Sequence, residues 1–148
     1  MEDLYSIKFT FEKKIREGLM TSLSNVQGGK YYVFGSLWEC FAWAAIIGFI
    51  YEKRLPLTPP MSDKPFNLQT MKNNGGEKIS DSLICLCIAK EQSLDFLKNP
   101  EKVISIINEY ANGGFYHIQT MIDNGEHSFR SFEDVKQEIF SRELVSNF

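Results

Sequence analysis

The sequence predicts a mainly α-helical fold, a compact single domain of residues 1–148 around a buried central helix at about 37–52. An apolar run from Leu37 to Tyr51 predicts the central helix, and apolar residues recur at helical spacing on both sides of it. A chain of 148 residues with 43% hydrophobic residues can bury a core without disulfides or a metal. The run contains Glu39 and is shorter than the roughly 20 residues that span a membrane, so we expect it in the core.

The amino-terminal segment alternates apolar and polar residues, which is typical of a short half-buried β-strand. Its polar face carries Ser6, Lys8 and Thr10. From 11 to 24 apolar residues recur every four positions, which predicts an amphipathic helix. This order resembles a ribbon-helix-helix unit, in which two chains pair their strands and place the polar face in a DNA major groove. The other interpretation is a strand that faces the core and has an ordinary polar exterior.

The central helix has clear start and stop signals. Ser36, followed by Glu39, forms the pattern of a capping box. Lys53 and Arg54 suit the negative carboxyl end of a helix, and Pro56 prevents its continuation. These signals place the helix at about 37–52 and a loop after it.

The second half of the chain is also predicted to be helical. Helices are expected at 79–89, 93–97, 100–111 and 114–122 and from 131 onward, and 66–71 fits a strand or a short helix. Asn99 is the expected N-cap of the helix that begins at Pro100. Gly113 is expected to adopt the left-handed conformation that ends this helix, with Gly114 starting the next one. The sequence thus predicts a sharp corner at these two glycines.

The charge is distributed unevenly along the chain. The formal net charge is −3, but residues 1–90 carry +2 and residues 91–148 carry −5, counted over Lys, Arg, Asp and Glu. This polarity would let an amino-terminal face meet an anion while the carboxy-terminal part stays solvated or meets a basic partner. Ordinary surface charge explains the same asymmetry.

The cysteines and histidines do not form a predicted metal site. Cys85 and Cys87 are two residues apart, so on a helix they point in different directions and cannot bind one ion together with His117 or His127. Cys40 lies inside the apolar helix, where burial disfavours the thiolate. The three cysteines cannot all pair, and Cys85 and Cys87 are too close in sequence to bridge without strain. Together with the absence of a recognisable signal peptide, this predicts a reduced, cytoplasmic protein, and we expect no cofactor.

No group of residues indicates catalysis. Glu133 and Asp134 lie in the first turn of a predicted helix, where the helix dipole explains acidic residues. The glycines at 28–29 and 75–76 lie near lysines but lack the order of a phosphate-binding P-loop. We therefore predict no catalytic and no metal-binding residues, and a protein that is not an enzyme.

Three sequence blocks occur in a characteristic order, at residues 34–49, 53–57 and 109–114. The residues that define them are Ser36, Glu39, Gly48, Pro56, Tyr110, Asn112, Gly113 and Gly114. Over roughly residues 30–125 these blocks resemble the small accessory proteins encoded beside bacterial DNA phosphorothioation (DNA sulfur modification) systems. The resemblance implies a role in defence against foreign DNA and brings no catalytic residues with it. A relative from another defence operon fits the same blocks.

Two functional hypotheses follow. The leading one is a non-catalytic accessory subunit of a bacterial antiphage or DNA-modification-linked system, which binds larger proteins of its operon or forms a homodimer. The alternative is a DNA-binding protein, a ribbon-helix-helix-like dimer that contacts phosphates and base edges. Its nucleic-acid-binding residues would be Ser6, Lys8, Thr10, Lys13, Lys30, Lys53 and Arg54.

Overall fold

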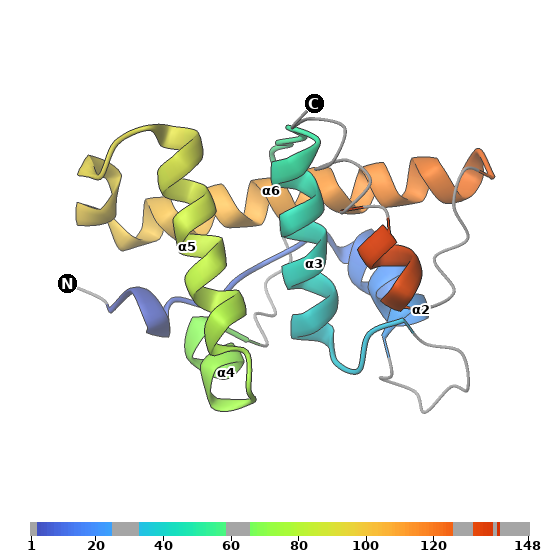
Figure 1. The fold of residues 1–148 in the computed structure, drawn as a ribbon, viewed down its shortest axis with the longest axis horizontal. Coiled ribbons are helices and arrows are strands. Elements are labelled where there is room, and N and C mark those ends of the chain that lie inside the picture. The colour runs from blue at the N-terminus through green and yellow to red at the C-terminus, as the bar shows by residue number, and fades with distance from the viewer. Residues whose placement is uncertain (1–2, 25–32, 59–65, 126–131, 138, 140–148) are drawn as a thin grey trace.

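The computed structural model describes residues 3–24, 33–58, 66–125, 132–137 and 139. The chain is mainly helical, as predicted (Figure 1). Its elements are η1 (Leu4–Ser6), α1 (Lys13–Ile15), η2 (Arg16–Met20), α2 (Thr21–Leu23), α3 (Leu37–Ile50), α4 (Leu68–Asn73), α5 (Glu77–Glu91), η3 (Asp95–Lys98) and α6 (Pro100–Asp123). Residues 132–137 are helical as well.

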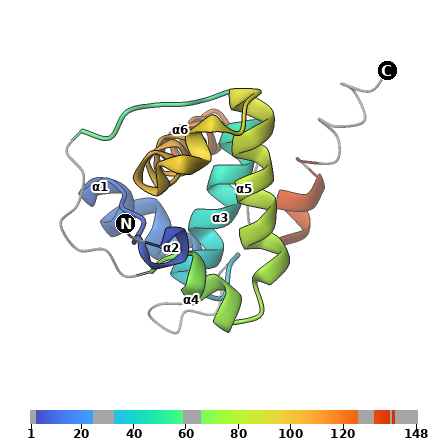
Figure 2. The same ribbon diagram turned by 90° about the vertical axis from the view of Figure 1, so that its left-hand side faces the viewer.

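Two helices run side by side in the same direction, and a third crosses behind them (Figures 1 and 2). At the start of α3 and α5, a Cβ atom on Gly76 would lie 2.8 Å from the ring of Trp38. At their ends, Lys90 Nζ lies 3.2 Å from Glu52 Oε1. Contacts at both ends show that α3 and α5 are parallel. The 24-residue helix α6 packs across their back and makes its most extensive contact with α3.

Two of the predicted helix starts, at Ser36 and Asn99, are confirmed. Ser36 Oγ accepts a hydrogen bond from the backbone N–H of Glu39 at 3.4 Å, and α3 follows directly. Asn99 caps α6 by accepting from the N–H of Lys102 at 3.3 Å. α3 is apolar on all sides, yet none of the helices in the described residues combines the length and the hydropathy that crossing a membrane requires.

The amphipathic helix expected near residues 11–24 is confirmed as one helical segment, residues 13–23, formed by α1, η2 and α2. Its middle part, η2, is wound as a π-helix. Ile15, Leu19, Met20 and Leu23 are buried. The four-residue spacing therefore identified the buried face correctly.

The prediction of an amino-terminal strand is wrong, and with it the ribbon-helix-helix unit. Within the described residues this segment makes only an isolated antiparallel bridge, between Lys8 and Asn67. The alternation arises because Phe9 and Phe11 are both buried, and the ring of Phe9 lies 4.8 Å from that of Phe41 on α3. The apolar side of the segment thus packs against the core of its own chain.

The corner predicted at Gly113 and Gly114 is also wrong. α6 continues through both glycines without interruption, and both are buried. Paired glycines usually end helices because they adopt left-handed conformations. Here they keep the helical conformation, because packing against α3 and the loop after it needs positions without a Cβ atom. The two helices expected at 100–111 and 114–122 are therefore one.

Candidate functional site

The three sequence blocks meet at the crossing of α3 and α6. A Cβ atom on Gly48 would overlap the carbonyl oxygen of Tyr110, and one on Gly114 would overlap that of Ala44. The backbones of the two helices are therefore in direct contact, which only glycine permits. One turn away, Phe49 stacks on Tyr110 with ring centroids 4.0 Å apart.

The loop that follows α3 is attached along α6 by the third block. Asn112 Nδ2 donates to the carbonyl oxygens of Leu55 at 3.3 Å and Pro56 at 3.2 Å. The N–H of Leu55 donates to the carbonyl oxygen of Glu109 at 3.1 Å. A Cβ atom on Gly113 would overlap the carbonyl oxygen of Lys53. The Tyr-Ala-Asn-Gly-Gly sequence thus serves as a docking surface for this loop.

A buried carboxylate, which the sequence analysis missed, completes this junction. Glu12 is only 2% exposed, and its Oε1 accepts from the hydroxyl of Tyr116 at 2.7 Å. Its Oε2 accepts from the N–H of Thr58 at 3.0 Å and from Asn112 Nδ2 at 3.1 Å. Burial alone would raise the pKa of Glu12, but these hydrogen bonds and the nearby Lys14 outweigh it and lower the pKa. Both oxygens are engaged, so the group holds three segments together and is poorly placed to act as a base.

Arg54 links the same loop to two helices. Its Nε lies 2.8 Å from Glu109 Oε1, and its Nη1 lies 3.3 Å from Glu91 Oε1. The guanidinium also lies 5.7 Å from the ring centroid of Tyr110. This residue was predicted to contact nucleic acid, but here its charge is shared between two carboxylates of its own chain.

The other predicted nucleic-acid residues are distributed over several elements. Lys13 pairs with Glu17 at 3.9 Å, and Lys53 is exposed without an ion pair in the described residues. Lys30 lies outside the described residues. Ser6, Lys8 and Thr10 are brought together, and they line one polar pocket beside α6.

The cysteines are not placed for catalysis or metal binding. Burial raises the pKa of both Cys40 and Cys87 to about 12, so their thiols stay protonated at neutral pH. Cys85 is exposed. The ring of His117 lies 4.0 Å from that of Tyr51, and His127 lies outside the described residues. The described part of the chain contains no group of three His, Cys, Asp or Glu residues that could hold a metal ion.

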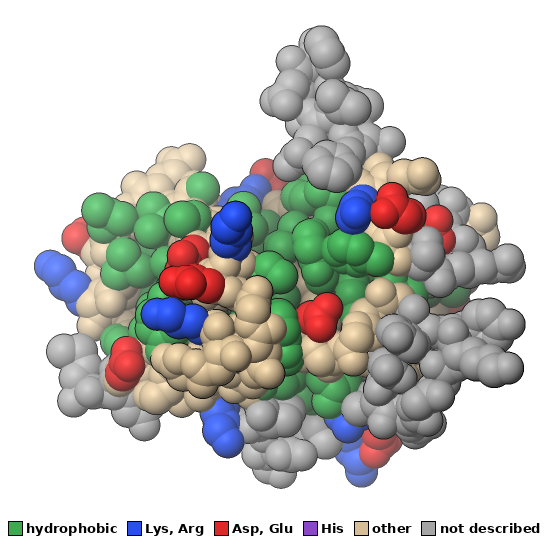
Figure 3. All heavy atoms as spheres, turned by 60° about the horizontal axis from the view of Figure 1, so that its bottom comes forward, with side chains coloured by type: hydrophobic (Ala, Val, Ile, Leu, Met, Phe, Trp, Pro, Cys, Tyr) green, Lys and Arg blue, Asp and Glu red, His purple; other side chains and the backbone are tan. Residues whose placement is uncertain are grey.

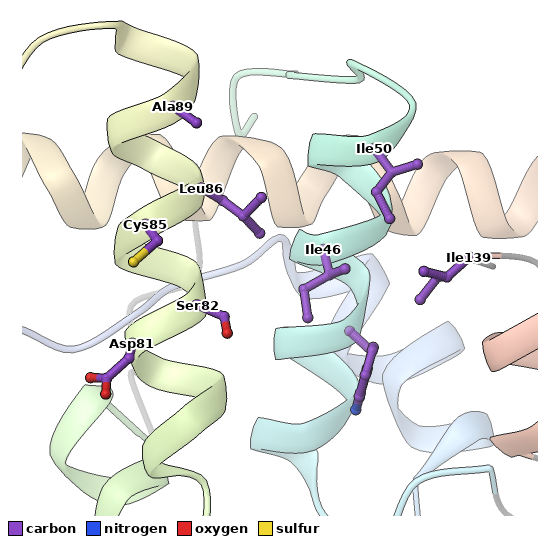
Figure 4. A pocket seen from close by; sticks show the side chains of 9 residues that line it. Ile46, Ile50, Asp81, Ser82, Cys85, Leu86, Ala89 and Ile139 are labelled. Atoms are coloured by element: carbon purple, nitrogen blue, oxygen red, sulfur yellow. The ribbon is translucent and has the colours of Figure 1, made fainter. Parts of the chain in front are cut away.

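An apolar groove of about 660 Å³ lies between α3 and α5 (Figure 4). It is lined by Trp43, Ile46, Ile50, Asp81, Ser82, Cys85, Leu86, Ala89 and Ile139. α3 supplies large side chains, whereas α5 supplies mostly small, exposed ones, and this difference leaves the space open. Hydrophobic side chains are also visible together near the middle of the face in Figure 3.

The spacing of the lining residues fits a helical ligand. Trp43, Ile46 and Ile50 follow one stripe of α3, and residues 82, 85, 86 and 89 follow one stripe of α5. Two parallel helices that present such stripes form the kind of groove that receives the apolar face of a third helix. The sequence predicted core positions for the α3 residues, because a helix that is apolar on all sides gives no periodic signal for its open side.

The comparisons with known proteins agree with the sequence blocks. A family model described as DNA sulphur modification system-associated protein 4 matches residues 13–144. The match confirms the resemblance that the sequence showed over roughly residues 30–125 and extends it in both directions. The chain matches no curated protein and no solved structure.

Proposed function

Because the chain belongs to the family of DNA sulphur modification system-associated protein 4, we propose that it is a non-catalytic accessory subunit of such a system. In this proposal it binds a larger protein of the same system through the groove between α3 and α5. The family is associated with a DNA sulphur modification system. The apolar groove is the observation that carries the proposal, since it offers partly exposed Trp43, Ile46 and Leu86 without a covering element in the described residues.

The occupant we propose is an amphipathic helix of the larger protein. Its apolar side chains would fill the space over Ser82 and Ala89, and its polar face would stay in water. Among the described residues of the lining, Asp81 at the groove edge is the only charged one, so a basic residue at the margin of that helix would complement it. The protonated thiols and the engaged carboxylate of Glu12 support a binding role over a catalytic one.

Co-expression with the other proteins of the operon tests this proposal. We expect one larger protein to co-purify with the chain, and Ser82→Arg to reduce its recovery because an arginine would place a charge in the apolar groove. Ser22→Arg is the matched control, since Ser22 is also an exposed helical serine but lies outside the groove. A chain that stays alone and monomeric at micromolar concentration would contradict the proposal.

DNA contact is the second candidate function, and fewer observations favour it. Phosphate binding needs several cations on one surface, because each contact adds to the salt dependence of the affinity. Of the predicted cationic contacts that the structure describes, Lys8 and Lys53 lack a carboxylate partner, whereas Lys13 and Arg54 have one. A gel-shift titration at about 50 mM salt tests this candidate. Binding that weakens in Lys8→Glu would support it, and no binding would remove it.

A further inference from the structure

A polar pocket of about 540 Å³ lies beside α6, between the amino-terminal segment and the first half of the helix. Figure 1 shows this segment, in blue, running along that half of α6. The pocket is lined by Ser6, Ile7, Lys8, Thr10, Glu101, Ile104, Ser105 and Asn108. Its volume falls in the range of about 300–1,000 Å³ that is usual for small-ligand sites.

Asn108 is the most informative residue of this pocket, because it is polar and only 9% exposed. Its Oδ1 accepts a hydrogen bond from the backbone N–H of Thr10 at 3.2 Å. This bond fixes the orientation of the side-chain amide, so the Nδ2 group is the free end. Nδ2 has no hydrogen-bond partner among the described residues, but it is not one of the fully enclosed side-chain atoms without a partner, so water can reach it. A ligand acceptor would replace that water and accept a hydrogen bond from Nδ2.

Two opposite charges line the same pocket without neutralising each other. Lys8 and Glu101 form no ion pair, with each other or with another described residue. Their formal charges sum to zero over the described lining, although the two side chains do not pair. A phosphate group would gain from Lys8 but would be repelled by Glu101. A ligand that carries one positive and one negative charge would match both.

We propose that this pocket binds a short zwitterionic peptide. Its carboxylate would lie at the end formed by Lys8 and Asn108 Nδ2, and its ammonium group at the end formed by Glu101. Glu101 and Asn108 are seven residues apart on α6, a separation of about 10 Å along the helix axis. An extended peptide advances about 3.3 Å per residue, so about three residues fill this length. The hydroxyl group of Ser105 also lines the pocket and suits the peptide backbone, whereas that of Ser6 already donates to the carbonyl oxygen of Asp3 at 2.7 Å.

Triglycine is the probe, because its only charges are its two termini. We would titrate it into the ¹⁵N-labelled full chain and follow the side-chain amide resonances of Asn108 together with the backbone amide of Thr10. N-acetyl-triglycine lacks the positive charge, and triglycine amide lacks the negative one. Each is expected to bind at least about tenfold more weakly, since each loses a charge-assisted hydrogen bond. Adenosine monophosphate tests the phosphate alternative.

Two variants test which residue binds each end of the peptide. Glu101→Gln should remove the preference for triglycine over N-acetyl-triglycine. Lys8→Gln should remove the preference for triglycine over triglycine amide. Glu17→Gln and Lys78→Gln change exposed charges outside the pocket and should leave both preferences unchanged. Absence of saturable shifts up to about 10 mM triglycine would overturn the proposal. So would tighter binding of adenosine monophosphate, or preferences that persist in both pocket variants.

Discussion

Gly48 of α3 and Gly114 of α6 lie backbone to backbone where the two helices cross. A Cβ atom on Gly48 would lie 3.2 Å from the backbone nitrogen of Gly114, and one on Gly114 would lie 3.1 Å from that of Gly48. Each would also overlap a carbonyl oxygen of the opposite helix. The contact explains why both residues belong to the family-like blocks: the largest helix contact of the described fold depends on them.

The first prediction is that Gly48→Ala and Gly114→Ala each lower the free energy of unfolding by about 2–4 kcal/mol, because the helices must separate to admit the methyl group. Gly18→Ala is the control. It lies in the helical segment 13–23, where a Cβ atom meets nothing within 4 Å. Alanine should leave stability unchanged there or raise it by up to about 1 kcal/mol. Urea unfolding followed by circular dichroism measures all three, and equal midpoints would contradict the assigned crossing.

The second prediction separates two explanations for Gly113. A left-handed residue tolerates asparagine better than alanine or valine. A position in close contact with the carbonyl oxygen of Lys53 rejects every side chain. We expect Gly113→Asn to be destabilised at least as much as Gly113→Ala. Gly113→Val should also be less stable than Gly113→Ala, because valine is larger and β-branched. The midpoints of thermal unfolding give the order of stability. A Gly113→Asn variant more stable than Gly113→Ala would restore the interpretation that Gly113 ends the helix.

The third prediction concerns Glu12 and pH. The pKa of Glu12 is lowered in the folded state, so its contribution to stability is present above the unfolded-state value of about 4.5 and is lost as pH falls through the folded-state pKa. Glu12→Gln should reduce stability near pH 7 by about 1.5–3 kcal/mol and flatten the acid limb of the stability profile. Glu17→Gln, which changes a carboxylate with 65% side-chain exposure, serves as the control. An acid limb as steep in Glu12→Gln as in the parent would argue against this role.

The fourth prediction concerns Arg54, whose side chain is 41% exposed. Ion pairs with this much exposure are weak, so a double-mutant cycle of Arg54→Ala and Glu109→Ala should give a coupling of about 0.5–1 kcal/mol. The coupling should decrease in high salt. A coupling above about 3 kcal/mol would show that the pair is more strongly desolvated than the structure indicates.

The sequence by itself determined the helical class, the central helix and the main helix starts. Those features depend on local physics: Ser36 and Asn99 cap the amides next to them, and the spacing of Ile15 and Leu19 follows from the helical repeat. The sequence blocks were also sufficient to identify the family, because their order is a property of the chain alone.

Only the tertiary structure decided what the glycines, the amino-terminal segment and the open faces do. Whether Gly113 ends a helix or admits a neighbouring backbone depends on Lys53, sixty residues earlier, and no local pattern encodes that contact. The same is true of Glu12, which meets Asn112 and Tyr116 a hundred residues later. The groove and the polar pocket are spaces between distant segments. They follow from how the helices pack, which the periodicity of a single segment does not determine.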